Sequence, residues 1–97
     1  MANAIGTATL DFGSDPGSNE ASITVTGQSA ILATSKVEAF VMGDDTTASH
    51  TASDHKYFPA LASLTCGTPT ASTGFTIYAR SIHKLTGAFA VRWVWSD

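Results

Sequence analysis

Apolar and polar residues alternate with a period of two along most of this 97-residue chain. The pattern is clearest from Phe75 to Ser81, where Phe, Ile and Ala alternate with Thr, Tyr and Arg. Alternation with this period is typical of a β-strand that has one face buried and the other in water. The same pattern predicts five further strands, at Thr7–Phe12, Ser22–Thr26, Lys36–Met42, Leu61–Cys66 and Ala88–Ser96.

Clusters of turn-forming residues separate these segments. Gly13–Asn19 and Gly67–Gly74 consist mainly of Gly, Pro, Ser, Thr, Asp and Asn, which disfavour regular elements. Short strands with such turns between them are typical of an all-β fold, so we expect a small antiparallel β-sandwich of about six to seven strands, jelly-roll- or lectin-like. A chain of this length forms one domain, residues 1–97. The alternative is a helix over Ala30–Phe40, although Thr34 and Val37 are poor helix formers.

The charge content is low, at 13% Asp, Glu, Lys and Arg against 43% hydrophobic residues. This composition favours folding over disorder, which goes with the opposite balance. Five Lys and Arg residues and eight Asp and Glu residues give a formal net charge of −3, which argues against binding to nucleic acid. No apolar run approaches the roughly 20 residues that cross a bilayer, and the N-terminal residues lack the pattern of a secretory signal. We therefore expect no membrane insertion, and synthesis in a cytoplasm.

The polar stretch Gly43–Lys56 is predicted to be a long loop, and it contains the densest set of potential metal ligands. Imidazole and carboxylate groups together suit zinc, manganese or nickel. The spacing matches no closed zinc motif, since the chain has a single cysteine, and a solvated loop explains the same residues. We expect no cofactor. If a metal binds, we expect it at a subunit axis where copies of His50 or His55 meet, with ligands drawn from Asp44, Asp45, His50, Asp54 and His55.

Residues for catalysis occur without an arrangement that would use them. The chain has no G-x-S-x-G nucleophile motif and no glycine-rich phosphate loop. Cys66 ends an apolar segment with nothing beside it in sequence to activate the thiol, which is typical of a small buried side chain. Glu38 with Asp44 or Asp45 is the carboxylate pair that a polysaccharide-cleaving enzyme would use, but a solvated surface explains these residues equally well. We therefore do not expect an enzyme.

The last predicted strand places four large apolar residues on one face: Phe89, Val91, Trp93 and Trp95. In so small a fold this ridge is expected to lie in the core. The alternative is that Trp95, near the chain end, extends beyond the core and contacts a partner or a sugar ring.

The other side of the last two strands carries arginine and tyrosine. We expect these strands to pair as a hairpin through His83–Gly87, so that Arg80 and Arg92 share an outer face with Tyr78. Because Arg and Tyr are enriched in subunit interfaces, this face suits burial against another subunit, although an ordinary exposed sheet face accounts for it equally. The interface candidates are therefore Tyr78, Arg80, Arg92 and Trp95.

Several segments resemble small β-sandwich proteins encoded among the structural genes of tailed bacteriophages. These segments are Ser35–Asp45, Leu64–Gly67, Gly74–Arg80 and Leu85–Trp95, and the opening Gly6–Gly13 is similar to the first strand of those proteins. The resemblance covers most of the chain through strand patterns rather than through a catalytic signature. It implies a virion component made in the host bacterial cytoplasm: a head decoration or head-fibre protein, or a tail-fibre module.

The resemblance also implies partners. Phage proteins of this kind are commonly trimers or hexamers, so we expect a homo-oligomer, with a trimer as the expected form, in contact with other virion proteins of the capsid or tail. The first strand also resembles that of H-type lectins, which bind sugars as oligomers, but none of their binding residues matches an identifiable position here. The alternative function is therefore a carbohydrate- or host-receptor-binding module of a tail fibre, with residues 43–56 or an exposed tryptophan contacting host surface glycan.

Overall fold

The computed structural model describes residues 2–97, and the all-β expectation is confirmed. Each of the six predicted segments forms a strand, although the bounds differ. The first strand begins four residues earlier than predicted, and the fifth continues to Leu85. The elements are β1 (Asn3–Asp11), β2 (Ser18–Val25), β3 (Lys36–Phe40), α1 (Ala52–Leu61), β4 (Ala62–Cys66), β5 (Phe75–Leu85) and β6 (Ala88–Ser96).

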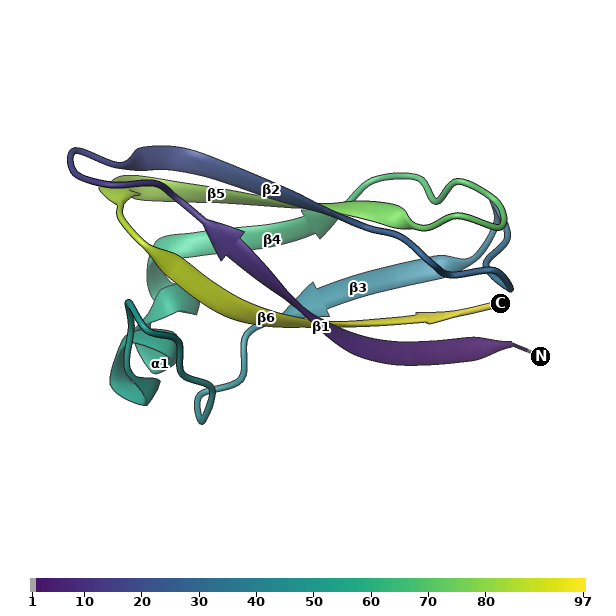
Figure 1. Cartoon of the computed structure of the whole chain (residues 1–97), viewed down its shortest axis with the longest axis horizontal. Coiled ribbons are helices and arrows are strands. Elements are labelled where there is room, and N and C mark those ends of the chain that lie inside the picture. The colour runs from purple at the N-terminus through teal and green to yellow at the C-terminus, as the bar shows by residue number, and fades with distance from the viewer. Residues whose placement is uncertain (1) are drawn as a thin grey trace.

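The strands form two three-stranded antiparallel sheets, with the orders β1-β6-β3 and β2-β5-β4. Figure 1 shows the two sheets as two layers, with α1 at one end and both chain termini at the other. The edge strands β1 and β2 contact each other, and so do β3 and β4, so the layers are in contact along both sides. The molecule is elongated along the strands, with extents of 40 × 23 × 21 Å.

The predicted hairpin between the last two strands is wrong. β5 and β6 belong to different sheets, and the short link between them carries the chain from one layer to the other. Gly87 in this link has a positive φ of 77°, a conformation that favours glycine. Its backbone N–H donates to the carbonyl of Gly13, and its carbonyl accepts from the N–H of Phe12, so the link pairs with the end of β1. Tyr78 and Arg80 therefore lie on a different sheet from Arg92.

The core lies between the inner faces of the two sheets. The ridge predicted for the last strand is buried, and it packs against the buried face of β5. The rings of Phe75 and Trp93 meet edge to face with centroids 5.3 Å apart, which joins the two layers. The fully or almost fully buried apolar residues are Leu10, Phe12, Ile31, Phe58, Phe75, Ile77, Ala79, Phe89, Val91, Trp93 and Trp95.

Small residues on β1 lie opposite the two tryptophans of β6. In the strand register Ala4 faces Trp95 and Gly6 faces Trp93. A Cβ atom built on Gly6 would overlap the indole ring of Trp93, so glycine leaves the space that this ring fills. The tryptophan side chains of β6 therefore fill the space that larger side chains on β1 would otherwise occupy.

Residues 43–56 do not form the single long loop that we predicted, because α1 begins within this segment at Ala52. Thr51 caps the helix, its Oγ1 accepting from the N–H of Asp54 while the Asp54 carboxylate accepts from the N–H of Thr51. The helix includes Pro59 and buries Phe58.

The alternative helix over residues 30–40 does not form, since β3 occupies Lys36–Phe40. Among residues 2–97, no helix has the length and apolar character needed to cross a membrane.

Candidate functional site

The five candidate metal ligands do not come together at one point. The structure engages four of them in contacts with one another or with other groups of the chain: Asp45 with Arg92, His50 with Asp54, and His55 with backbone groups. Within residues 2–97, there is no group of three or more His, Cys, Asp or Glu side chains placed to hold a metal ion.

His55 is a structural residue of the core. Its side chain is completely buried, and Nε2 accepts a hydrogen bond of 3.0 Å from the backbone N–H of Ala90. Because Nε2 accepts, the proton of the neutral ring lies on Nδ1, which donates to the Thr51 carbonyl at 2.8 Å. Both nitrogens are thus occupied: Nδ1 bonds to the N-cap residue of α1, and Nε2 bonds to Ala90 and so ties α1 to β6. The expectation that copies of His55 meet at a subunit axis is wrong, since the ring has no exposed surface.

His50 connects the start of α1 to the β5–β6 link. Its Nδ1 lies 3.0 Å from Oδ2 of Asp54, its Nε2 lies 2.6 Å from the carbonyl oxygen of Thr86, and its ring stacks on Phe89. The hydrogen bond from His50, and then that from the Thr51 N–H, hold the pKa of Asp54 below its ordinary value. His50 and Asp54 therefore act on each other and on the fold rather than as free ligands.

Arg92 and Asp45 form a two-pronged ion pair. Nε of Arg92 donates to Oδ2 of Asp45 at 3.1 Å, and Nη2 donates to Oδ1 at 2.7 Å. The hydrogen bonds from Arg92 lower the pKa of Asp45, and the same contact raises the pKa of Arg92. Both carboxylate oxygens of Asp45 are therefore occupied. This leaves Asp45 unsuited to the metal-binding and acid–base roles considered for it.

Cys66 behaves as the sequence indicates. The thiol is free and partly buried, and it packs against the core from the end of β4. Desolvation, with a smaller contribution from the charge of Glu38, raises the pKa of Cys66. A raised pKa disfavours the reactive thiolate.

The four interface candidates lie in three different places. Trp95 is only 2% exposed, and its indole N–H donates to Oε1 of Gln28 at 3.0 Å. It therefore belongs to the core, and the suggestion that it extends outward to a partner is wrong. Tyr78 and Arg80 lie on the outer face of the β2-β5-β4 sheet, whereas Arg92 lies on that of the β1-β6-β3 sheet.

The outer face of the β1-β6-β3 sheet exposes a group of large apolar side chains. Ile5 is 81% exposed, Phe40 41% and Met42 38%. Val94 lies between the two edge strands, directly opposite Ile5 in the register. Ile5, Phe40 and Met42 line a groove of about 360 Å³ that also borders Arg92. We call this surface the apolar face.

Ile5 lies outside the first predicted strand, which begins at Thr7, whereas β1 begins at Asn3. Its neighbours Ala4 and Gly6, at the adjacent inward positions, are small. These two positions are small because they face the tryptophans of β6. If small residues such as Ala and Gly are accepted at inward positions, the alternating pattern extends toward the N-terminus. The predicted strand then includes Ile5 and places its side chain on the outer face of the sheet.

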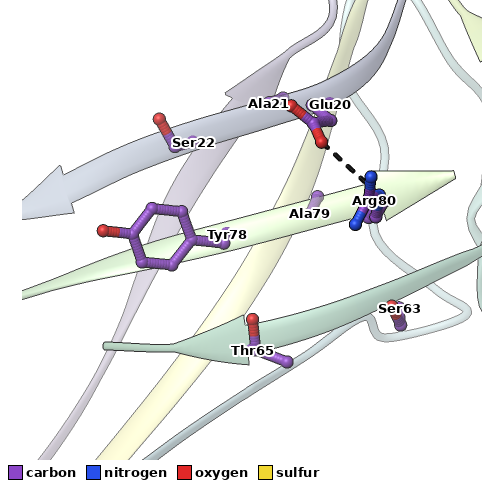
Figure 2. Close-up of a pocket in the computed structure, with 8 residues that line it drawn as sticks. All are labelled: Glu20, Ala21, Ser22, Ser63, Thr65, Tyr78, Ala79 and Arg80. Carbon is purple, nitrogen blue, oxygen red and sulfur yellow. Dashed lines mark ion pairs between the residues drawn. The ribbon is translucent and has the colours of Figure 1, made fainter. Parts of the chain in front are cut away.

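The outer face of the β2-β5-β4 sheet carries a second, more polar groove of about 480 Å³. Figure 2 shows that its side chains come from all three strands, with Tyr78 and Arg80 on the central strand β5. In the register, Tyr78 has Ser22 and Thr65 on either side. We call this surface the tyrosine groove.

Comparisons with protein-family models, with curated proteins and with solved structures found no match for this chain. The function is therefore inferred from the residues and from the two surfaces described above.

Proposed function

We propose that this protein is a non-enzymatic structural subunit that assembles with copies of itself through the apolar face. The observation that carries the proposal is the 81% exposure of Ile5 beside the partly exposed Phe40 and Met42, all bordering one groove. Contiguous apolar side chains of this kind mark interaction sites on proteins that are otherwise well packed. A trimer is the form implied by the resemblance to phage proteins.

The charges around the apolar face support a second copy of the chain as the occupant. Arg92 is already paired with Asp45, and β3 presents Lys36 and Glu38, of opposite sign, on the same side. Two such faces can meet without a large excess of like charge. The low charge content of the whole chain also keeps the desolvation cost of burial small.

The resemblance to tailed-phage structural proteins indicates where such an assembly would work. We infer a virion location, on the capsid surface or in a head or tail fibre, after synthesis in the host cytoplasm. Other virion proteins of the capsid or tail would then be the second class of partner. Labelled antibodies against the chain should bind intact particles, and particles that lack the protein would contradict this location.

The two surfaces that the sequence offered for glycan binding are not supported. Both tryptophans are buried, at 6% exposure for Trp93 and 2% for Trp95. The second half of the 43–56 segment is occupied by α1 and its cap, and its two histidines are engaged with neighbouring groups.

Analytical ultracentrifugation of the purified chain tests the assembly. We expect a trimer or larger species for the natural sequence, and a shift toward monomer for the double variant Ile5→Ser, Phe40→Ser. Both side chains are exposed in the single chain, so the variant should keep its fold, which far-UV circular dichroism checks.

Ile82→Ser is the matched control. Ile82 is 73% exposed on β5, in the other sheet, so removing it should leave the oligomer unchanged. A natural chain that sediments as a monomer at micromolar concentration contradicts the proposal. If the Ile82→Ser variant dissociates and the double variant does not, the interface lies on the β2-β5-β4 sheet, which also contradicts the proposal.

A further inference from the structure

The tyrosine groove has an exposed aromatic ring at its centre. Tyr78 is 50% exposed, and its neighbours across the two adjacent strands are the short hydroxyl side chains of Ser22 and Thr65. Gly67 lies beside the ring: a Cβ built there would stand 3.3 Å from Cε2 of Tyr78. Figure 2 shows Ser22 and Thr65 on the strands that flank the ring. Because these neighbours are short, half of the Tyr78 side chain stays exposed and can meet a ligand.

An ion pair lies two residues along β5 from the ring, between Arg80 and Glu20 of the neighbouring strand β2. Nε of Arg80 is 3.4 Å from Oε1 of Glu20, and both side chains are largely exposed, at 80% and 66%. An ion pair this open contributes little to stability, so both groups can exchange partners with a ligand. Ser63 faces Arg80 from the neighbouring strand and adds a hydroxyl. Donors and acceptors thus lie in the same groove as the aromatic ring.

We propose that the tyrosine groove binds one pyranose unit of a neutral saccharide. The C–H face of the sugar would pack on the Tyr78 ring, and its hydroxyls would bond to the guanidinium of Arg80, the carboxylate of Glu20 and the hydroxyl of Ser63. A groove of about 480 Å³ lies in the size range of small-molecule sites, which combine apolar surface with a few polar groups.

The charge of the groove favours a neutral ligand. Arg80 is the one cation among the residues that line it, and Glu20 balances that charge. A phosphate or nucleotide would have to separate this pair and would meet the carboxylate of Glu20. Vicinal sugar hydroxyls, which both donate and accept, match a guanidinium beside a carboxylate without any change in net charge.

This site lies on the opposite sheet from the apolar face, so it does not depend on the proposed assembly. The two can fail separately. The Ile5→Ser, Phe40→Ser variant should therefore bind a monovalent sugar as the natural chain does.

Titration of the ¹⁵N-labelled full chain with methyl glycosides tests the proposal. The probes are the methyl pyranosides of glucose, galactose, mannose and N-acetylglucosamine. For at least one of them we expect saturable amide shifts confined to residues 20–22, 63–65 and 78–80, with a dissociation constant on the order of 1 mM.

Two variants of Tyr78, compared with a control, test the role of the ring. Tyr78→Ser should abolish the shifts, and Tyr78→Phe should retain most of the affinity because it keeps the aromatic surface. Tyr57→Ser is the matched control, since Tyr57 is 71% exposed on α1, and it should bind as the natural chain does. Arg80→Gln should weaken binding several-fold without moving the site.

Three results would overturn the proposal. One is the absence of shifts with all four glycosides, and another is shifts that persist in Tyr78→Ser. The third is a Tyr78 ring whose resonances change with protein concentration and whose substitution dissociates the oligomer, since the groove would then be covered by a second copy.

Discussion

At the scale of single residues, the titratable side chains Asp45, His50, Asp54 and His55 act on the fold. Alternation places Arg92 correctly on the outer side of its strand, but its partner Asp45 lies 47 positions away in a segment without periodicity. A pairing between such distant residues depends on how the two segments are brought together. The sequence therefore offered Asp45 as a metal ligand, and the structure assigns it to an ion pair.

The ion pair predicts a specific loss of stability in acid. Arg92 holds the pKa of Asp45 below the ordinary aspartate value of about 4, so the folded chain takes up the proton less readily than the unfolded chain does. The stabilisation is therefore complete above that ordinary value and is lost as the pH falls through the lower folded value.

Urea unfolding at a series of pH values measures this effect. Asp45→Asn should lower the free energy of unfolding at neutral pH and make its decrease below about pH 4 less steep. Arg92→Gln should have the same two effects. The free energy of unfolding of the double variant should be only slightly lower than that of either single variant, because each substitution removes the same ion pair. Additive losses in the double variant would contradict the pairing.

At the scale of elements, the strands could be predicted and the helix could not. In a strand, a few consecutive residues are enough to reveal the alternation of buried and exposed side chains. The helix α1 buries only His55 and Phe58 and contains Pro59, so its sequence shows no clear helical spacing of apolar residues. Its start was nevertheless visible. Thr51 followed three residues later by Asp54 has the form of a capping box with aspartate in place of glutamate.

The cap makes α1 testable on its own. Thr51→Ala removes the hydroxyl that accepts from the Asp54 N–H and should cost about 1 kcal/mol of unfolding free energy. Thr51→Ser keeps the hydroxyl and should cost much less. Amide hydrogen exchange should show the loss first at the start of α1, where the cap acts. Equal stability of the Ala and Ser variants would show that the cap contributes nothing.

At the scale of the whole molecule, the two sheets present two different outer faces. The expected hairpin would have gathered Tyr78, Arg80 and Arg92 on one surface, but the crossing at Gly87 separates them. The face around Ile5 is apolar, and the face around Tyr78 is lined by hydroxyls and an ion pair. We therefore propose different occupants for the two surfaces, a second copy for the apolar face and a small polar ligand for the tyrosine groove.

Assembly through the apolar face predicts that thermal stability depends on protein concentration. Subunit association stabilises the folded state by mass action, so the Tm of the natural chain should rise as the concentration is increased. The Ile5→Ser, Phe40→Ser variant should unfold at a Tm that does not change with concentration, while Ile82→Ser should behave as the natural chain does. Differential scanning calorimetry measures all three, and a concentration-independent Tm for the natural chain contradicts assembly.

The sequence by itself determined the six strands and the inward face of most of them, including the burial of the ridge from Phe89 to Trp95. The reason is local: backbone geometry turns successive side chains to opposite sides, so a few neighbouring residues are enough. Only the tertiary structure decided which strands share a sheet, which groups bond to Asp45 and His55, and why β1 carries glycine beneath Trp93. Those contacts join residues far apart in the chain, and they follow from how the layers pack rather than from any repeating pattern.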